Sequence, residues 1–100
     1  MQTHKIESNL EIHQKVAQKV LDMQGAVNLR AITSSMVAQM DELRAVGITG
    51  DLLNNHPTVL AFVSKLNSLT RFDSSREMAA FNHLEDLKEG KPVTYEVIPL

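Results

Sequence analysis

The chain of 100 residues contains no cysteine and no tryptophan. The absence of cysteine excludes disulfide bonds, thiolate nucleophiles and cysteine-based zinc sites. Aromatic residues make up only 4% of the chain, and binding by base stacking needs exposed rings, so that mode of nucleic-acid recognition is disfavoured. The hydrophobic share of 43% is ordinary for a globular domain. We therefore expect a folded protein with a mainly aliphatic core.

Long apolar runs and a strong excess of charge are absent as well. No segment approaches the roughly 18 apolar residues of a membrane-spanning helix, and residues 1–7 lack the apolar segment of a signal peptide. The formal net charge of −2 at pH 7 gives no electrostatic signature for nucleic acid or an anionic membrane. We expect one cytoplasmic domain over residues 1–100 that makes no contact with membranes.

What the sequence does contain is helical periodicity. Apolar residues recur every three or four positions in four stretches. Ser8 and Glu11 have the spacing of a capping box before the first stretch, as do Ser74 and Glu77 before the fourth. The second stretch is predicted to start near Asn28. These signals predict four helices.

The fold class expected is therefore mainly α, a four-helix bundle-like domain with a short C-terminal β-strand or extended tail. The expected division is an N-terminal arm at residues 1–7, helices over 8–90 and the strand or tail at 91–100. The third helix, about 57–70, carries the widest apolar face and is expected to be the most buried element.

The end of the second helix is the clearest local signal. Arg44 lies in the last turn, Gly47 suits a left-handed cap, and Ile48 is placed for the hydrophobic contact of a Schellman motif. A short helical turn is expected after Asp51, and Pro57 suits the first position of the next helix, with Asn55 or His56 as its cap. Between them, the segment 54–56 offers two amides and an imidazole that we expect on an exposed loop.

The tail at residues 91–100 has the alternation of a β-strand. Val93, Tyr95 and Val97 share one face, while Thr94, Glu96 and Ile98 share the other. A lone strand leaves its backbone N–H and C=O groups unpaired, so it needs a partner. The sequence leaves three partners open: the N-terminal segment 3–6, a second copy of the tail, or the sheet edge of another protein.

The function predicted first is protein–protein contact by a non-enzymatic homodimer. The tail is one candidate interface, and the second helix is the other, because its apolar residues mix three- and four-residue steps as in a coiled-coil seam. Packing inside the monomer explains the same seam and is the reading that we favour for it. The contact residues expected are Met36, Met40, Tyr95, Val97 and Ile98.

Motifs for chemistry are not found. The histidines His4, His13, His56 and His83 have no second histidine at helical spacing, and no metal-binding motif is present. Adjacent carboxylates on a helix diverge, and no serine lies in a nucleophile elbow. We therefore predict no catalytic residue, no cofactor and no metal site.

Two other functions stay open at this stage. One is a small regulator that touches nucleic acid, if folding gathers Lys15, Lys19, Arg30 and Arg44 on one face. The faint helix-turn-helix pattern around Gly47 is weakened because its second helix carries no Lys or Arg for phosphates. The other is a small-ligand binder with a pocket between helices near His56.

Overall fold

The computed structural model describes residues 2–69 and 77–99, except for the side chains of residues 77–79. Helices dominate these residues, and two short strands pair near the ends of the chain. The elements in chain order are β1 (Gln2–Ile6), α1 (Leu10–Asp22), α2 (Leu29–Ala45), α3 (Asp51–Asn54), α4 (Pro57–Leu69), α5 (Glu77–Lys88) and β2 (Val93–Val97). The expected helical class is confirmed, together with a small antiparallel sheet.

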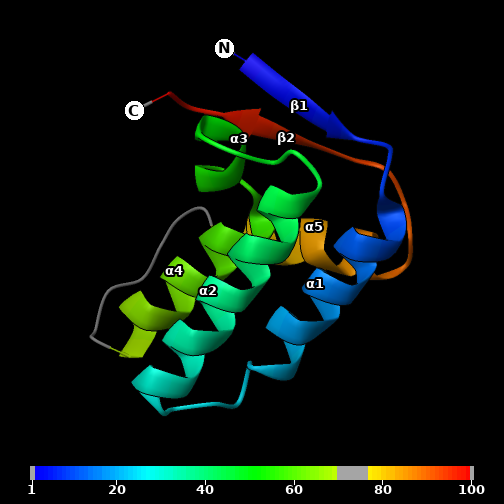
Figure 1. Cartoon of the computed structure of the whole chain (residues 1–100). Coiled ribbons are helices and arrows are strands. Elements are labelled where there is room, and N and C mark those ends of the chain that lie inside the picture. Colours follow the sequence, from blue (N-terminus) through cyan, green and yellow to red (C-terminus); the bar gives the residue numbers. More distant parts are fainter. Residues whose placement is uncertain (1, 70–76, 100) are drawn as a thin grey trace.

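The four long helices pack against one another beneath the sheet. α1 contacts α2 and α5, and α4 contacts the same two helices. The sheet crosses one end of this group, with α3 next to β2 and β1 as the outermost element (Figure 1). Among the described helices, none combines the length and the apolar character needed to cross a membrane.

The C-terminal tail is ordered, and its partner is the N-terminal segment. β1 and β2 pair antiparallel, with Gln2 opposite Val97, His4 opposite Tyr95 and Ile6 opposite Val93. The predicted alternation of β2 is confirmed, since Val93, Tyr95 and Val97 are buried and the residues between them are exposed. Of the three partners that the sequence left open, the structure contains the one within the chain.

The predicted end of the second helix is confirmed in detail. The N–H of Ile48 donates to the carbonyl of Leu43, and the N–H of Gly47 donates to that of Arg44. This pattern defines a Schellman motif, and Gly47 has the left-handed φ of 88° that it requires. The start is also as expected, because the Asn28 side chain accepts a hydrogen bond from the N–H of Ala31.

The capping box predicted at Ser8 is wrong. α1 begins one residue later, and its N-cap Asn9 makes no side-chain capping bond. Only two residues outside regular structure, Glu7 and Ser8, precede this cap after β1 ends, and Asn9 takes a left-handed conformation with φ 55°. Asparagine tolerates that conformation better than most residues. The second predicted box, Ser74 with Glu77, lies outside the residues whose side chains are described.

The core is aliphatic, as expected, and joins the sheet to the helices. Side chains from β1, β2 and the four long helices form its main cluster, with Phe62, Leu84 and Ile32 almost fully buried. The prediction for the third helix holds best in its first half, because Val63 and Leu69 are exposed. A smaller cluster packs around Leu43 between α1, α2, α3 and α4.

Candidate functional site

Three of the four histidines, which lie far apart in the sequence, come together beneath the sheet. His13 lies in the second turn of α1, His56 immediately precedes α4, and His4 is on β1. The rings of His13 and His56 are nearly parallel, at 16°, with centroids 5.2 Å apart. His13 is 2% exposed and His56 is fully buried. Two imidazoles removed from water are costly unless their nitrogens are satisfied, so their hydrogen bonds define the site.

The hydrogen bonds fix one tautomer for each of the two buried rings. The backbone N–H of Thr58 donates to Nδ1 of His56 across 3.1 Å. Because Nδ1 accepts, a neutral His56 carries its proton on Nε2, which lies 3.2 Å from Nδ1 of His13. His56 is therefore the donor in this bond, and a neutral His13 carries its own proton on Nε2.

His56 thus makes two different hydrogen bonds at the start of α4. Its side chain caps the helix by accepting from the N–H of the second helical residue, Thr58, which is a task that Ser, Thr, Asp or Asn usually performs. Its other ring nitrogen reaches across to α1. Pro57 follows in the first helical position, as predicted.

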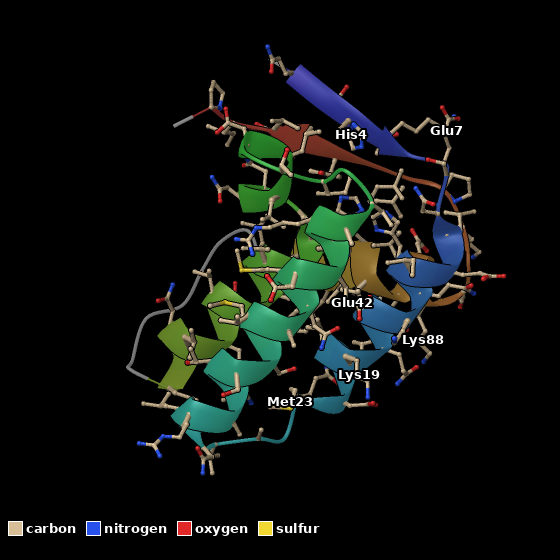
Figure 2. All side chains as sticks on the ribbon, viewed as in Figure 1. His4, Glu7, Lys19, Met23, Glu42 and Lys88 are labelled. Carbon is tan, nitrogen blue, oxygen red and sulfur yellow. The ribbon has the colours of Figure 1, made fainter. Side chains whose placement is uncertain are left out.

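Tyr95 of β2 closes the cluster on the side of the sheet. Its ring meets His56 edge-on, with centroids 5.5 Å apart, and it meets His4 in the same way at 5.5 Å. The Tyr95 hydroxyl donates to the carbonyl of Leu52 across 2.6 Å. Figure 2 shows His4 on the helix side of the β1 ribbon. The strands therefore contribute two rings to a site built on helix ends.

Burial keeps both inner histidines neutral. Desolvation, reinforced by the neighbouring His4, lowers the pKa of His13 from 6.5 to about 4. The same cause, together with His13 and His4, lowers the pKa of His56 to about 3. Desolvation also raises the pKa of Tyr95 above its ordinary 10.0. At neutral pH all three groups are uncharged, which agrees with the tautomers drawn from the hydrogen bonds.

A pocket of about 170 Å³ opens beside His13, between β1, the start of α1 and the turn that follows α2. Its lining combines polar and apolar groups: His4, Lys5, Ile6, Ser8, Asn9, His13, Val46, Gly47, Ile48 and Leu52. Within residues 2–69 and 77–99, no group of three or more histidine, cysteine or acidic side chains is arranged to hold a metal ion.

The residues expected to make partner contacts are distributed unevenly. Tyr95 and Val97 are 3% and 4% exposed and lie inside the core. Met36 and Met40 are half-buried and pack on the two core clusters, so the middle of the apolar seam of α2 faces the interior. Ile98 alone of the five is exposed, at 44%. Within the single chain, the other four side chains therefore contact the chain's own core.

The basic residues named for nucleic-acid contact do not form a single unpaired group. The Lys15 ammonium lies 3.7 Å from the Glu42 carboxylate, and Glu42 points from α2 toward α1 (Figure 2). Arg44 pairs with Asp41 one helical turn away on α2, at 2.8 Å. The short α3 carries no basic side chain, so the helix-turn-helix pattern gains nothing from the fold.

The loop at residues 54–56 is less exposed than expected. Asn54 is exposed, but Asn55 and His56 are buried. The Asn55 amide donates to the carbonyls of Asp51 and Ile98, each across 2.9 Å, and so fastens the end of β2 to α3. The small-ligand alternative expected a pocket between helices near His56; the pocket described above lies beside His13 instead, and His56 is not among the residues that line it.

Comparisons with known proteins found no match: no protein-family model, no curated protein and no solved structure is similar to this chain.

Proposed function

We propose that the protein acts by protein–protein contact as a homodimer, without enzymatic activity, and that two copies join through the outer edges of their β1 strands. We also propose that the four long helices form a bundle that supports this sheet. The observation that carries the proposal is the position of β1: it pairs with β2 on one side, and within the described residues no strand pairs with its other side.

An open strand edge is a ready site for another strand. In an antiparallel pair, alternate residues direct their N–H and C=O groups away from the partner, so β1 presents such groups outward. β1 is also the outermost element of the fold (Figure 1). Directly after β2, the carbonyl of Ile98 is already bonded to Asn55, and α3 lies alongside the strand. The edge of β1 is therefore the better candidate for strand addition.

A second copy fits this edge by the sequence of β1 itself. Pairing two β1 strands antiparallel about His4 places Thr3 opposite Lys5 of the other copy, and it places Gln2 opposite Ile6. No like charges then lie directly opposite each other, which favours the pairing. The result is a four-stranded sheet with β1 strands at its centre, and such an isologous contact closes as a dimer. A two-stranded sheet gains stability from the added strands.

The decisive experiment is the solution mass of the full chain and of charge variants, measured by light scattering over a range of concentrations. Thr3→Lys sets two like charges opposite each other across the proposed interface, twice per dimer. Within the chain Thr3 lies opposite Glu96, so the same change does not weaken the β1–β2 pair. We expect the dimer dissociation constant to rise about tenfold, while the thermal midpoint at concentrations where the chain is monomeric is unchanged or higher.

Two control variants separate the edge from other surfaces. Asn82→Lys adds the same charge at an exposed position on α5 and is expected to leave the dimer intact. Val37→Lys places a charge at a side chain of α2 that is 50% exposed, and it tests a helical interface instead. A monomeric wild-type chain, or a dimer that Val37→Lys disrupts and Thr3→Lys does not, overturns the proposal. Removing the tail after Gly90 is not a clean test, because Val93, Tyr95 and Val97 belong to the core.

A further inference from the structure

Two neighbouring helices, α2 and α4, present apolar side chains to solvent. They pack against each other and run in opposite directions (Figure 1). Val37 is the central residue of α2 and is 50% exposed, and Val63 is the central residue of α4 and is 42% exposed. Leu29, the first residue of α2, is half exposed as well. Exposed apolar side chains that gather in one place mark a contact surface for another molecule.

The helical repeat of α2 places Leu29 and Val37 on its α4 side. α2 lies between α1 and α4 (Figure 1). Glu42 points from α2 toward α1, where its carboxylate lies 3.7 Å from the Lys15 ammonium (Figure 2). At 3.6 residues per turn, Leu29 and Val37 each lie about 140° around the helix from Glu42. Both side chains are therefore on the half of α2 that is turned away from α1.

Val63 lies on the side of α4 that is turned toward α2. Val59, one helical turn earlier, is buried in the cluster that contains Leu43 of α2, and Met40 of α2 packs against the same cluster. Residues four apart lie on the same side of a helix. Val63 is therefore at the exposed rim of the contact between the two helices. The α2–α4 face is the name used below for the surface formed by Leu29, Val37 and Val63.

The charged groups beside the α2–α4 face are mainly basic. Arg30 and Arg44 each lie seven residues from Val37, which is close to two turns, so they flank it on the same side of α2. α4 contains no acidic residue. Asp41 lies near Val37 and pairs with Arg44 at 2.8 Å, but this pair is exposed and therefore weak. Two arginines against one aspartate make this face positive, whereas the whole chain has a formal charge of −2.

We propose that the α2–α4 face binds an acidic amphipathic helix of a partner protein. The apolar side chains of that helix lie on Val37 and Val63, and its carboxylates lie beside Arg30 and Arg44. An amphipathic helix laid on an apolar surface is a recurring mode of recognition, and guanidinium groups pair with carboxylates through two parallel hydrogen bonds. This face is on the helices, whereas the proposed dimer uses the outer edge of β1, so neither proposal depends on the other.

The experiment uses a blocked synthetic peptide of about 18 residues, which as a helix matches the 17 residues of α2 in length. Its leucines recur at helical spacing on one side, and glutamates flank them. The fluorescence anisotropy of the labelled peptide is measured while the full chain is added. We expect saturable binding with a dissociation constant in the micromolar range that rises with salt. A second peptide, with lysine in place of every glutamate, is expected to bind at least about tenfold more weakly.

Variants of the apolar residues test where the peptide lies. Val37→Glu and Val63→Glu each remove an apolar contact and set a carboxylate against the acidic peptide, so each should weaken binding about tenfold. Ile98→Glu is the matched control, because Ile98 is 44% exposed and directly follows β2 in the sheet, away from this face. It is expected to leave binding unchanged. The thermal midpoint of each variant checks that the fold is intact.

Variants of the charged residues test the sign of the partner. Arg44→Gln is expected to weaken binding of the glutamate peptide several-fold, and Asp41→Asn is expected to tighten it by removing a like charge. Lys88→Gln is the control, because Lys88 pairs with Glu85 on α5 at the same three-residue spacing and with similar exposure. It is expected to change nothing.

The absence of saturable binding overturns the proposal, as does equal binding of the lysine peptide or an equal effect of Val37→Glu and Ile98→Glu. A dimer that Val37→Glu dissociates also overturns it, because a second copy of the chain then covers this face. Thr3→Lys is expected to dissociate the dimer without weakening peptide binding. The failure of one proposal can therefore be told from the failure of the other.

Discussion

The Nε2–H of His56 donates to Nδ1 of His13 across 3.2 Å, and this bond joins the start of α4 to α1 inside the protein. Both rings are neutral, because burial lowers the pKa of each. A neutral imidazole can accept at one ring nitrogen and donate at the other. A serine or asparagine side chain at this position would be shorter or differently shaped, so it would not place its donor at the same point. The stability of the fold should therefore respond both to the side chain at position 56 and to acid.

Replacing His56 tests its role as a helix cap. His56→Ala removes the acceptor for the Thr58 N–H, leaves His13 without its donor and opens a cavity, so we expect a loss of about 3 kcal/mol. His56→Asn keeps a residue that favours the cap position and is expected to cost less. Urea unfolding of both variants measures the difference. Equal losses would show that capping by this side chain is unimportant.

Acid should destabilise the protein between pH 6.5 and about 3. The unfolded chain binds protons at histidine with the ordinary pKa of 6.5, whereas folded His13 and His56 bind them only near 4 and 3. The unfolded state therefore binds more protons in this window, and stability falls as the pH falls. The expected loss by pH 5 is on the order of 2 kcal/mol for each histidine.

Urea unfolding at pH 7 and pH 5 measures this loss of stability. His83→Gln is the control, and it should lose as much stability between the two pH values as the wild-type protein does. His13→Gln is expected to reduce the difference between the two pH values. If His13→Gln leaves the difference as large as in the wild-type protein, the acid sensitivity comes from other groups.

Tyr95 should show the opposite dependence at high pH. Burial raises the pKa of its hydroxyl above 10.0, so above pH 10 the unfolded chain loses this proton more readily than the folded one, and stability falls as the pH rises. Because the chain has one tyrosine and no tryptophan, absorbance of the tyrosinate reports this group alone. We expect it to appear only as the protein unfolds; ordinary ionisation near pH 10 in the folded state would contradict the burial.

The bond from Tyr95 to the carbonyl of Leu52 can be removed with little change of shape. Tyr95→Phe leaves this acceptor without its donor, so we expect a loss of about 1–2 kcal/mol in the free energy of unfolding at neutral pH. The variant should also lack the part of the alkaline instability that comes from the hydroxyl. Thermal unfolding at pH 7 and above pH 10 measures both effects.

Two glycines with positive φ offer a matched comparison. Gly47 (φ 88°) has open space where a Cβ would lie, so Gly47→Ala is expected to cost about 1 kcal/mol from backbone strain alone. At Gly90 (φ 80°) a Cβ would lie 2.9 Å from Nε2 of Gln14, which bonds the carbonyl of Lys88. Gly90→Ala should cost slightly more, because the flexible end of Gln14 must move. A much larger cost at Gly47 would contradict the open space there.

The hydroxyl of Thr58 is buried, and within the described part of the chain its Oγ1 has no hydrogen-bond partner. Valine has nearly the same shape and no polar atom to desolvate. Thr58→Val is therefore expected to raise the free energy of unfolding by about 1 kcal/mol. Chemical unfolding of the variant measures the change, and a loss of stability would indicate that a water or another group satisfies this hydroxyl.

The features that the sequence predicted well are local ones. Gly47, Arg44 and Ile48 lie within five residues, and their order is enough to specify a Schellman motif. The box at Ser8 was equally local but failed, because the connection from β1 into α1 is governed by contacts with β2 that no short pattern contains. A tertiary constraint there overrides a capping preference.

The histidine site was missed for a related reason. His13 and His56 are 43 positions apart, and nothing in their spacing relates one to the other. The sequence predicts Asn55 or His56 as the cap before Pro57, but it also places both residues on an exposed loop, whereas the structure buries them. The one available signal was the placement of His56 directly before Pro57, which marked it as a candidate cap without showing what its ring would face.

The pairing of β1 with β2 also has a consequence in time. Ribosomes make chains from the N-terminus at roughly 5–20 residues per second, so β1 is synthesised on the order of ten seconds before β2, the strand with which it pairs. Throughout that interval the core formed by the helices lacks the side chains of Val93, Tyr95 and Val97. The backbone N–H and C=O groups on both edges of β1 are then unpaired. A growing chain of this design is most exposed to chaperones, and to wrong strand partners, until β2 is made.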